Sequence, residues 1–399
     1  MNHPPQALQG VRVLELGTLI AGPFAARILG EFGAEVVKIE QPGEGDPLRN
    51  WRMLHRGTSL WWHAQARNKR SVTANLRAAE GQEIVRALSR RSDVIIENFR
   101  PGALEKWNLS YAELSKDNPG LIMVRLSGYG QTGPYRDRPG FGSIGEAMGG
   151  IRYLTGHPDR PPARAGISLG DSLAGLYGVI GALLALQHRQ HNGGKGQLVD
   201  VALYEAVFSL LESTLPEYGM TGFVRERSGG ALPGITPSNT YACKDGSFVV
   251  IGANGDAIFK RLMGAMGRPD LAGDPALVHN AGRSARAEEL DAAISSWTAG
   301  FELDDVLKKL HQAEVPAAPI YSIADIVKDA HYQARRMIEK VRTQDGDEVL
   351  LPGIVPKLSD TPGETRWPGP RLGQHTAEVL RELGYDDDRQ RALREKGVI

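Results

Sequence analysis

Cysteine is almost absent from this chain of 399 residues, in which Cys243 is the single example. One thiol excludes an internal disulfide and any metal site built from several cysteines. Charge of one sign is also lacking, because 47 Lys and Arg side chains balance 47 Asp and Glu side chains. Without a net positive field, nucleic acid is not an expected partner. A site for an anionic ligand must therefore come from a local cluster.

Long hydrophobic runs and export signals are missing as well. The longest apolar run, residues 173–186, is shorter than the roughly 18 residues of a membrane-spanning candidate and contains three glycines. The first residues show no basic segment followed by an apolar one. The sequence therefore predicts a core helix at this run, no membrane partner and a cytoplasmic location.

The common nucleotide fingerprints are not found. The turn Leu16–Pro23 has no G-x-G-x-x-G pattern, so Glu40 is most simply a charge at a strand end rather than a ribose ligand. The loop Gly193–Gly196 is followed by Gln197, which breaks the phosphate-loop pattern. His188 and His191 have no third ligand at suitable spacing, so no metal site is predicted.

Glycine, in contrast, is abundant, with 48 residues or about 12%, against an average of roughly 7%. This excess is typical of tight turns and of close backbone approaches around a bulky ligand. The length exceeds that of one ordinary core, which predicts two domains.

Strand and helix patterns alternate in the N-terminal half, which predicts a parallel sheet covered by helices. The expected strands are 11–16, 34–40, 92–97, 121–126 and 198–202, and the expected helices include 24–32 and 79–90. A hairpin at 240–252 and helices at 257–266, 286–297 and 302–313 then suggest a smaller α+β domain. A helix at 324–337, strands between 341 and 354 and a helix at 376–383 follow. The predicted organisation is a large domain from 1–220 completed by 320–399, and a small domain at 221–319.

Asp171 stands between a glycine and the apolar, glycine-rich run, so two interpretations are open. An Asp before a helix is a natural N-cap that satisfies free backbone N–H groups. Alternatively, the helix dipole keeps the carboxylate ionised and presents it as a nucleophile.

Nine short motifs carry a resemblance over nearly the whole chain. They are Gly17–Pro23, Gly33–Glu40, Gly43–Asp46, Asn68–Ser71, Glu97–Gly102, Gly128–Pro134, Leu169–Asp171, Gly194–Asp200 and Leu372–Thr376. Each is weak alone, but in this order they resemble the class III CoA-transferases. The resemblance implies an α/β fold with a Rossmann-like large domain built from both chain ends, a smaller α+β domain, and an interlocked homodimer.

The resemblance also implies a reaction in which Asp171 is the nucleophile. Asp171 would attack a donor thioester, form a mixed anhydride, and then become an aspartyl-CoA thioester that the acceptor acid attacks. Coenzyme A esters would be substrates, and no permanently bound cofactor is implied. Gly229 and Gly230 resemble the mobile glycine loop that closes over the aspartate and could donate N–H groups to an oxyanion; an ordinary flexible loop is the alternative.

By the same resemblance, the residues that bind the coenzyme A ester fall into four groups, although each cation alone could be a surface charge. They are Asn75, Leu76 and Arg77 for the adenine; Glu97, Asn98, Phe99 and Arg100 for the pantetheine and pyrophosphate; Lys106 and Arg138 for further phosphate contacts; and Leu19, Ile20 and Phe141 for the thioester end.

The segments 140–150 and 160–164 look most like enzymes that move CoA from succinyl-CoA to C4–C5 dicarboxylates such as malate, citramalate, itaconate, mesaconate or glutarate. Formyl-CoA transferases carry glutamine where Ile20 stands, and Gly142 replaces the usual acidic residue of the family. Arg52, Arg70 and Arg164 are candidates for binding the second carboxylate. A transferase for oxalate or carnitine, a 2-methylacyl-CoA racemase that uses a His/Asp pair such as His157 with Asp171, and a non-catalytic acyl-CoA binder remain alternatives.

Overall fold

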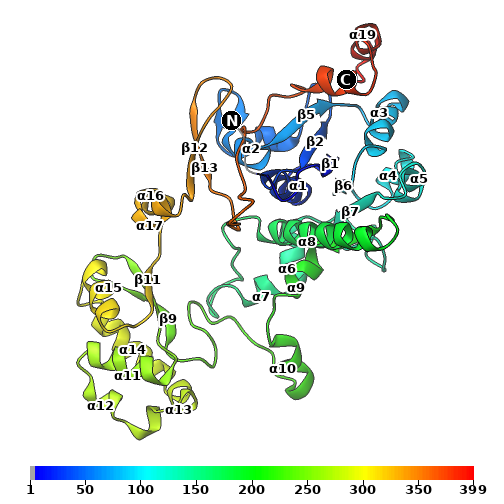
Figure 1. Ribbon diagram of the computed structural model, residues 1–399. Coiled ribbons are helices and arrows are strands. Elements are labelled where there is room, and N and C mark those ends of the chain that lie inside the picture. Colours follow the sequence, from blue (N-terminus) through cyan, green and yellow to red (C-terminus); the bar gives the residue numbers. More distant parts are fainter. Residues whose placement is uncertain (1–4) are drawn as a thin grey trace. The chain divides into compact units, whose positions relative to one another are not determined.

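The computed structural model describes residues 5–399, and their contacts divide them into two compact units (Figure 1). The first unit comprises the chain up to Ile151 together with 165–221 and 333–399, and the second comprises 152–164 and 222–332. Both ends of the chain therefore contribute to the first unit. The second unit also takes in 152–164 and 320–332, which the predicted boundaries assign to the large domain. The domains 1–220, 221–319 and 320–399 stay a prediction.

The core of the first unit is a six-stranded parallel sheet in the order β5-β2-β1-β6-β7-β8. Its strands are β1 (Arg12–Glu15), β2 (Glu35–Glu40), β5 (Lys69–Thr73), β6 (Val94–Glu97), β7 (Ile122–Ser127) and β8 (Leu198–Ala202). This confirms the predicted parallel sheet and adds β5, which the sequence analysis had not assigned. The strand order reverses between β1 and β6, and ligands of such sheets bind at the carboxyl ends beside that switch point.

Helices cover both faces of this sheet, because successive strand residues point to opposite sides. Leu14 belongs to a core shared with α3, α5, α18 and α19, whereas Val13 belongs to a core shared with α1 and α8 (Figure 1). The covering helices are α1 (Ala21–Glu31), α3 (Ala79–Ser89), α5 (Tyr111–Asp117), α8 (Leu169–His191), α18 (Thr376–Glu382) and α19 (Asp387–Glu395). Helix α1 begins at Ala21, three residues before the predicted start at residue 24, and α19 had not been assigned.

The shorter elements complete the chain up to residue 221 and the hairpin after residue 337. They are η1 (Pro47–Asn50), β3 (Leu54–His55), β4 (Thr58–Ser59), α2 (Leu60–Gln65), α4 (Ala103–Lys106), α6 (Gly142–Met148), α7 (Ile151–Leu154), α9 (Leu203–Phe208), α10 (Thr214–Thr221), β12 (Ile338–Arg342) and β13 (Glu348–Pro352).

Helix α8 is longer than the apolar run from which it was predicted. By length and composition it is the one helix within residues 5–399 that could cross a membrane. It packs in the core, where Gly175 lies against α1: a Cβ at this position would be 2.9 Å from the Ala21 carbonyl oxygen. Ser168 is the N-cap residue and Asp171 is the third residue of the helix. The N-cap interpretation of Asp171 is therefore wrong, because the helix begins earlier.

The second unit contains a three-stranded antiparallel sheet in the order β11-β10-β9, packed against helices. The hairpin of β9 and β10 was predicted, and β11 was not. A single helix at 324–337 is wrong, because Asp329 accepts the N–H groups of His331 and Tyr332 and starts a new turn. The elements are β9 (Ser238–Ala242), β10 (Phe248–Gly252), α11 (Asp256–Ala265), α12 (Pro269–Ala272), η2 (Pro275–Leu277), α13 (Asn280–Ala285), α14 (Ala287–Thr298), α15 (Leu303–Gln312), β11 (Ala317–Pro319), α16 (Ile323–Lys328) and α17 (Ala330–Ala334).

Candidate active site

The loop between β1 and α1 lies at the switch point of the sheet. The Thr18 N–H donates to Asn98 Oδ1 at 2.8 Å, and Asn98 Nδ2 donates to the Thr18 carbonyl oxygen at 2.9 Å. Asn98 directly follows β6, so this reciprocal pair joins the carboxyl ends of the two strands between which the order reverses. The predicted residue Asn98 therefore holds the loop in place.

The next residue of the loop, Leu19, adopts a left-handed backbone conformation with φ 64°. Such a conformation costs a non-glycine residue about 1–3 kcal/mol unless its surroundings impose it. The Leu19 N–H donates to both oxygens of the buried Asp46 carboxylate, at 3.1 and 3.2 Å. Gln65 Nε2 donates to the Ile20 carbonyl oxygen at 3.0 Å. Side chains from outside the loop thus fix the two residues predicted at the thioester end.

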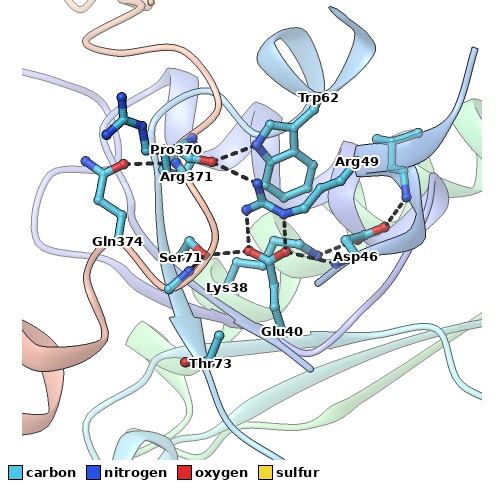
Figure 2. A network of polar contacts seen from close by, with 12 residues as sticks. Lys38, Glu40, Asp46, Arg49, Trp62, Ser71, Thr73, Pro370, Arg371 and Gln374 are labelled. Carbon is cyan, nitrogen blue, oxygen red and sulfur yellow. Dashed lines mark hydrogen bonds and ion pairs between the residues drawn. The ribbon is translucent and has the colours of Figure 1, made fainter. Parts of the chain in front are cut away.

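Asp46 belongs to a buried ionic network beneath this loop, part of which Figure 2 shows. Lys38 Nζ lies 2.8 Å from Asp46 Oδ2, 2.8 Å from Glu15 Oε1 and 2.8 Å from the Gly17 carbonyl oxygen. Lys69 Nζ lies 2.7 Å from the other oxygen of Glu15 and donates to the Pro23 carbonyl oxygen at 2.7 Å. Two ammonium groups therefore balance two carboxylates, as a buried ionic cluster requires.

The two lysines of this network titrate differently. Burial lowers the pKa of Lys69 to about 8, although the neighbouring Glu15 opposes the effect. Burial also acts to lower the pKa of Lys38, but Asp46 and Glu15 together raise it above its ordinary value. Lys38 therefore stays protonated and keeps Asp46 ionised, whereas Lys69 loses its proton at mildly alkaline pH.

Glu40 joins this region to the C-terminal segment. Its two oxygens accept Arg49 Nε and Nη2, each at 2.8 Å, and Ser71 Oγ donates to it at 2.6 Å. Arg49 Nη1 and Trp62 Nε1 both donate to the Pro370 carbonyl oxygen, at 3.1 and 2.9 Å (Figure 2). Glu40 is the charge at the end of β2 that the sequence predicted, but it is buried and forms a bidentate ion pair.

A pocket of about 270 Å³ opens beside the network and the end of β1. Three of the predicted residues, Leu76, Arg77 and Phe99, line it, and Phe99 is braced by Trp107 in an edge-on contact at 5.2 Å between ring centroids. The other lining residues are Leu16, Thr18, Ile39, Glu40, Gln41, Glu44, Gly45, Asp46, Pro47, Ala74 and Trp107 itself. The lining thus combines apolar side chains suited to a flat ring, three acidic side chains and the cation Arg77.

The remaining predicted cations lie outside this pocket. Arg100 and Lys106 are exposed and do not line it, and Arg138 stacks on Tyr135 with its guanidinium carbon 3.5 Å from the ring centroid. Asn75 accepts the Arg77 N–H at 3.0 Å and so shapes the turn that carries Arg77.

Glu97 differs from the other predicted residues because it is wholly buried. Its carboxylate accepts Arg125 Nε at 2.6 Å and the Phe99 N–H at 2.7 Å. These contacts orient the backbone that carries Phe99 into the pocket wall.

Asp171 projects from the first turn of α8 and is partly buried. Its carboxylate lies against Gly142, the first residue of α6: a Cβ on Gly142 would be 2.0 Å from Asp171 Oδ2. Asp171 also precedes Gly175, the contact with the start of α1, by one helical turn. The structure therefore places Asp171 at the end of α8 that adjoins the loop carrying Ile20. Phe141, next to Gly142, is 67% exposed.

Gly229 and Gly230 belong to the second unit and are both exposed. The Gly229 N–H donates to the Gly156 carbonyl oxygen at 2.9 Å, and a Cβ on Gly229 would be 2.8 Å from His157 Nδ1. His157, the proton-transfer candidate, therefore packs on this glycine loop.

The three arginines proposed for a second carboxylate have different surroundings. Arg70 binds Glu35, Glu378 and Glu382, at 2.7, 2.9 and 2.5 Å, and is therefore already occupied. Arg52 is exposed beside Trp61, and Arg164 is exposed in the second unit. Of the three, Arg70 is not suited to bind an acceptor acid.

The residues that sequence analysis missed are those of the ionic network, above all Lys38 and Asp46. Both stand inside motifs that were recognised, but their charges look like ordinary surface charges in the sequence. Within residues 5–399, no three His, Cys, Asp or Glu side chains gather as ligands for a metal ion.

The fold is α/β, with a parallel sheet, a pocket at its switch point and a carboxylate at the start of a core helix. Proteins with such sheets bind ligands at the switch point, which here lies beside β1 and β6. The chain belongs to CoA-transferase family III, whose model matches residues 8–376, and it is a CoA-transferase. This confirms the family and the enzyme class predicted from the motifs.

Two curated relatives and one solved structure illustrate the likeness. The chain is 51% identical to the succinyl-CoA–D-citramalate CoA-transferase of Chloroflexus aurantiacus, over 100% of this chain and 99% of that protein. It is 47% identical to the succinyl-CoA–L-malate CoA-transferase beta subunit of the same organism, over 98% of each. A CAIB/BAIF family protein from Brucella suis has a similar structure, with a TM-score of 0.85 and 36% identity over 95% of this chain and 100% of that one.

Proposed function

We propose that this enzyme transfers CoA from succinyl-CoA to a C4–C5 dicarboxylate and that Asp171 is its nucleophile. The observation that carries the proposal is the position of Asp171, a carboxylate in the first turn of a core helix beside the loop at the switch point. The names of the relatives that act on citramalate and malate support the choice of donor and acceptor.

The chemistry suits an aspartate. A carboxylate with an ordinary pKa near 3.9 is ionised at neutral pH and needs no general base. Asp171 attacks the thioester carbonyl of succinyl-CoA, and the C–S bond breaks to give a succinyl-aspartyl anhydride and CoA thiolate. The thiolate then attacks the aspartyl carbonyl of this anhydride, which leaves an aspartyl-CoA thioester and free succinate.

The second half reverses these steps with a new acid. The acceptor carboxylate attacks the aspartyl thioester and expels CoA thiolate, which gives an acceptor-aspartyl anhydride. The thiolate then attacks the acceptor carbonyl, so that the acceptor-CoA ester forms and the Asp171 carboxylate is regenerated. Protons are not consumed, and water must be excluded because an anhydride hydrolyses.

We assign the pocket beside β1 to the nucleotide end of the CoA ester. Its apolar wall, which includes Leu76 and Phe99, suits the adenine ring, and Arg77 suits a phosphate. The backbone-fixed residues Leu19 and Ile20 then face the thioester end. Arg100, Lys106 and Arg138 stay predictions as further phosphate contacts, and no permanently bound cofactor is proposed.

The glycine loop and the homodimer are also part of the proposal. Gly229 and Gly230 would close over Asp171 and donate N–H groups to the oxyanions.

A homodimer is supported by exposed apolar side chains that recur along α8, namely Leu176, Ile180 and Leu184. Such a stripe is typical of a surface that another chain covers. Sedimentation of the purified protein tests the dimer. A cytoplasmic location stays a prediction.

The test of the transfer reaction is a mass-spectrometric screen. The purified enzyme is incubated with succinyl-CoA and, separately, malate, citramalate, itaconate, mesaconate, glutarate, oxalate or carnitine. We expect new CoA esters of the dicarboxylates and release of succinate. If succinyl-CoA is unchanged with every dicarboxylate while formyl-, acetyl- or 2-methylacyl-CoA reacts, the proposed donor is wrong.

A further inference from the structure

The carboxylate of Asp171 occupies the space that a side chain at position 142 would fill. A Cβ on Gly142 would lie 2.0 Å from Asp171 Oδ2, 2.5 Å from Cγ and 3.0 Å from Oδ1. All three distances are shorter than an ordinary contact between a carbon and these atoms. Gly142 is buried, and its bare Cα forms the surface on which the carboxylate lies.

Gly170, the residue before Asp171, contacts helix α6 as well. The Gly170 N–H donates to Glu146 Oε1 at 3.2 Å, and a Cβ on Gly170 would be 2.7 Å from the Gly142 carbonyl oxygen. Glu146 is only 2% exposed and lies one helical turn after Gly142 in α6. The first turn of α8 is thus held against α6 on both sides of this contact.

Helix α6 has little freedom to move away, because Gly145 in the helix and Gly149 directly after it pack on α9. A Cβ on Gly145 would lie 2.8 Å from Leu203 Cβ, and the residue after α6, Gly149, would bring a Cβ within 2.6 Å of Val207 Cβ. A side chain at position 142 must therefore displace Asp171 rather than α6.

We propose that Gly142 and Glu146 are positioning residues for CoA transfer: Gly142 provides the space that sets the direction of the Asp171 carboxylate, and Glu146 fixes the backbone just before it. This inference rests on the proposed role of Asp171 as the nucleophile. It also means that any side chain at position 142 is incompatible with the position that the Asp171 carboxylate takes.

The expected effect is on catalysis rather than on binding. A nucleophile displaced by about 1 Å from the productive geometry can lose roughly 100-fold in rate. The pocket assigned to the nucleotide lies beside β1, and none of its lining residues belongs to α6 or α8. A change at position 142 should therefore lower kcat and leave the KM for succinyl-CoA nearly constant.

The first experiment compares Gly142→Ala with Gly264→Ala. Gly264 lies in helix α11 of the second unit, and a Cβ there meets nothing within 4 Å, so this variant controls for adding a methyl group to a helical glycine. We expect kcat of Gly142→Ala to fall about 100-fold with KM changed less than about threefold, and the yield of aspartyl-CoA thioester in a single turnover to fall with it. Wild-type kcat in Gly142→Ala would overturn the inference.

A second pair of variants at Glu146 keeps the test decisive if Gly142→Ala does not fold. Glu146→Gln retains an oxygen that accepts the Gly170 N–H, whereas Glu146→Ala does not. We expect kcat to fall at least about tenfold in Glu146→Ala and to be largely restored in Glu146→Gln, and equal kcat values for the two would overturn the role of Glu146.

Asp171→Asn distinguishes failure of the proposed function from failure of this inference. If Asp171→Asn retains turnover, the proposed function is wrong. If Asp171→Asn is inactive while Gly142→Ala has normal kcat, only this inference is wrong.

Discussion

Both oxygens of the Asp46 carboxylate accept the N–H of Leu19, at 3.1 and 3.2 Å. A charged side chain from the segment after β2 thus holds a non-glycine residue in the left-handed region. Lys38 neutralises the Asp46 carboxylate. The left-handed conformation of Leu19 therefore depends on the buried charge of Asp46, which in turn depends on Lys38. Leu19, which was predicted at the thioester end, is therefore oriented by a network whose member Asp46 also lines the pocket beside β1.

Removal of the Asp46 carboxylate should strongly destabilise the protein. Asp46→Ala leaves Lys38 buried with one carboxylate fewer, and such a loss costs about 3–5 kcal/mol of the free energy of unfolding. Urea unfolding measures this change. The exposed ion pair of Arg268 and Asp270, at 2.7 Å, offers the control, since Asp270→Ala should leave the unfolding midpoint nearly unchanged. Similar midpoints for both variants would contradict a structural role for Asp46.

The depressed pKa of Lys69 predicts a dependence of stability on pH. The folded protein releases this proton near pH 8, whereas the unfolded chain holds it to about pH 10.4. Between these values the unfolded state binds more protons, so stability rises with pH. The free energy of unfolding of the wild type, relative to Lys69→Met, should grow by up to about 3 kcal/mol over this range. A constant difference between the two proteins from pH 8 to 10.5 would contradict the shift.

Asp171→Asn should abolish transfer while the fold is kept. An amide of the same shape fills the space on Gly142, but it is not an anionic nucleophile, and loss of a nucleophile commonly costs roughly 10⁴-fold or more in kcat. The measurement is CoA transfer from succinyl-CoA to citramalate, with the circular dichroism spectrum as the control for folding. Turnover at the wild-type rate would exclude Asp171 as the nucleophile.

Arg77→Ala should raise the KM for succinyl-CoA about tenfold or more with little change in kcat, because it removes a contact that binds substrate and transition state equally. Arg100→Ala provides the comparison, since Arg100 does not line the pocket. We expect the smaller effect from Arg100→Ala. The reverse order would move the phosphate site away from this pocket.

Gly175→Ala tests the close approach of α8 to α1. A methyl group would lie 2.9 Å from both the Ala21 carbonyl oxygen and Phe24 Cδ1, and overpacking of this kind costs about 1–3 kcal/mol. Gly264→Ala should instead stabilise the protein by up to about 1 kcal/mol, because alanine favours a helix over glycine where space is open. The free energies of unfolding of the two variants should therefore change in opposite directions, and a gain in Gly175→Ala would contradict the close packing.

Much of the fold could be predicted from the sequence because hydrophobic periodicity and turn residues act locally. The strand at 198–202 was predicted with the bounds that β8 has. Two elements were not predicted correctly. The helix at 324–337 is divided because Asp329 starts a new turn through its own hydrogen bonds. Strand β11 was not recognised because it is only three residues long and forms by pairing with β10. The homodimer and the glycine lid stay predictions.

By itself, the sequence determined the family and the parallel sheet, because ordered motifs and short-range patterns are written along the chain. It also led to the prediction that Asp171 is the nucleophile. Only the tertiary structure decided that Asp171 lies on Gly142, that Asp46 holds Leu19, and that Lys38 and Lys69 share Glu15. These residues are far apart in sequence, and a charge or a glycine has the same letter whether it is exposed or buried. Burial and partners, which set the energy of a charge and the consequence of a missing Cβ, arise only when the chain folds.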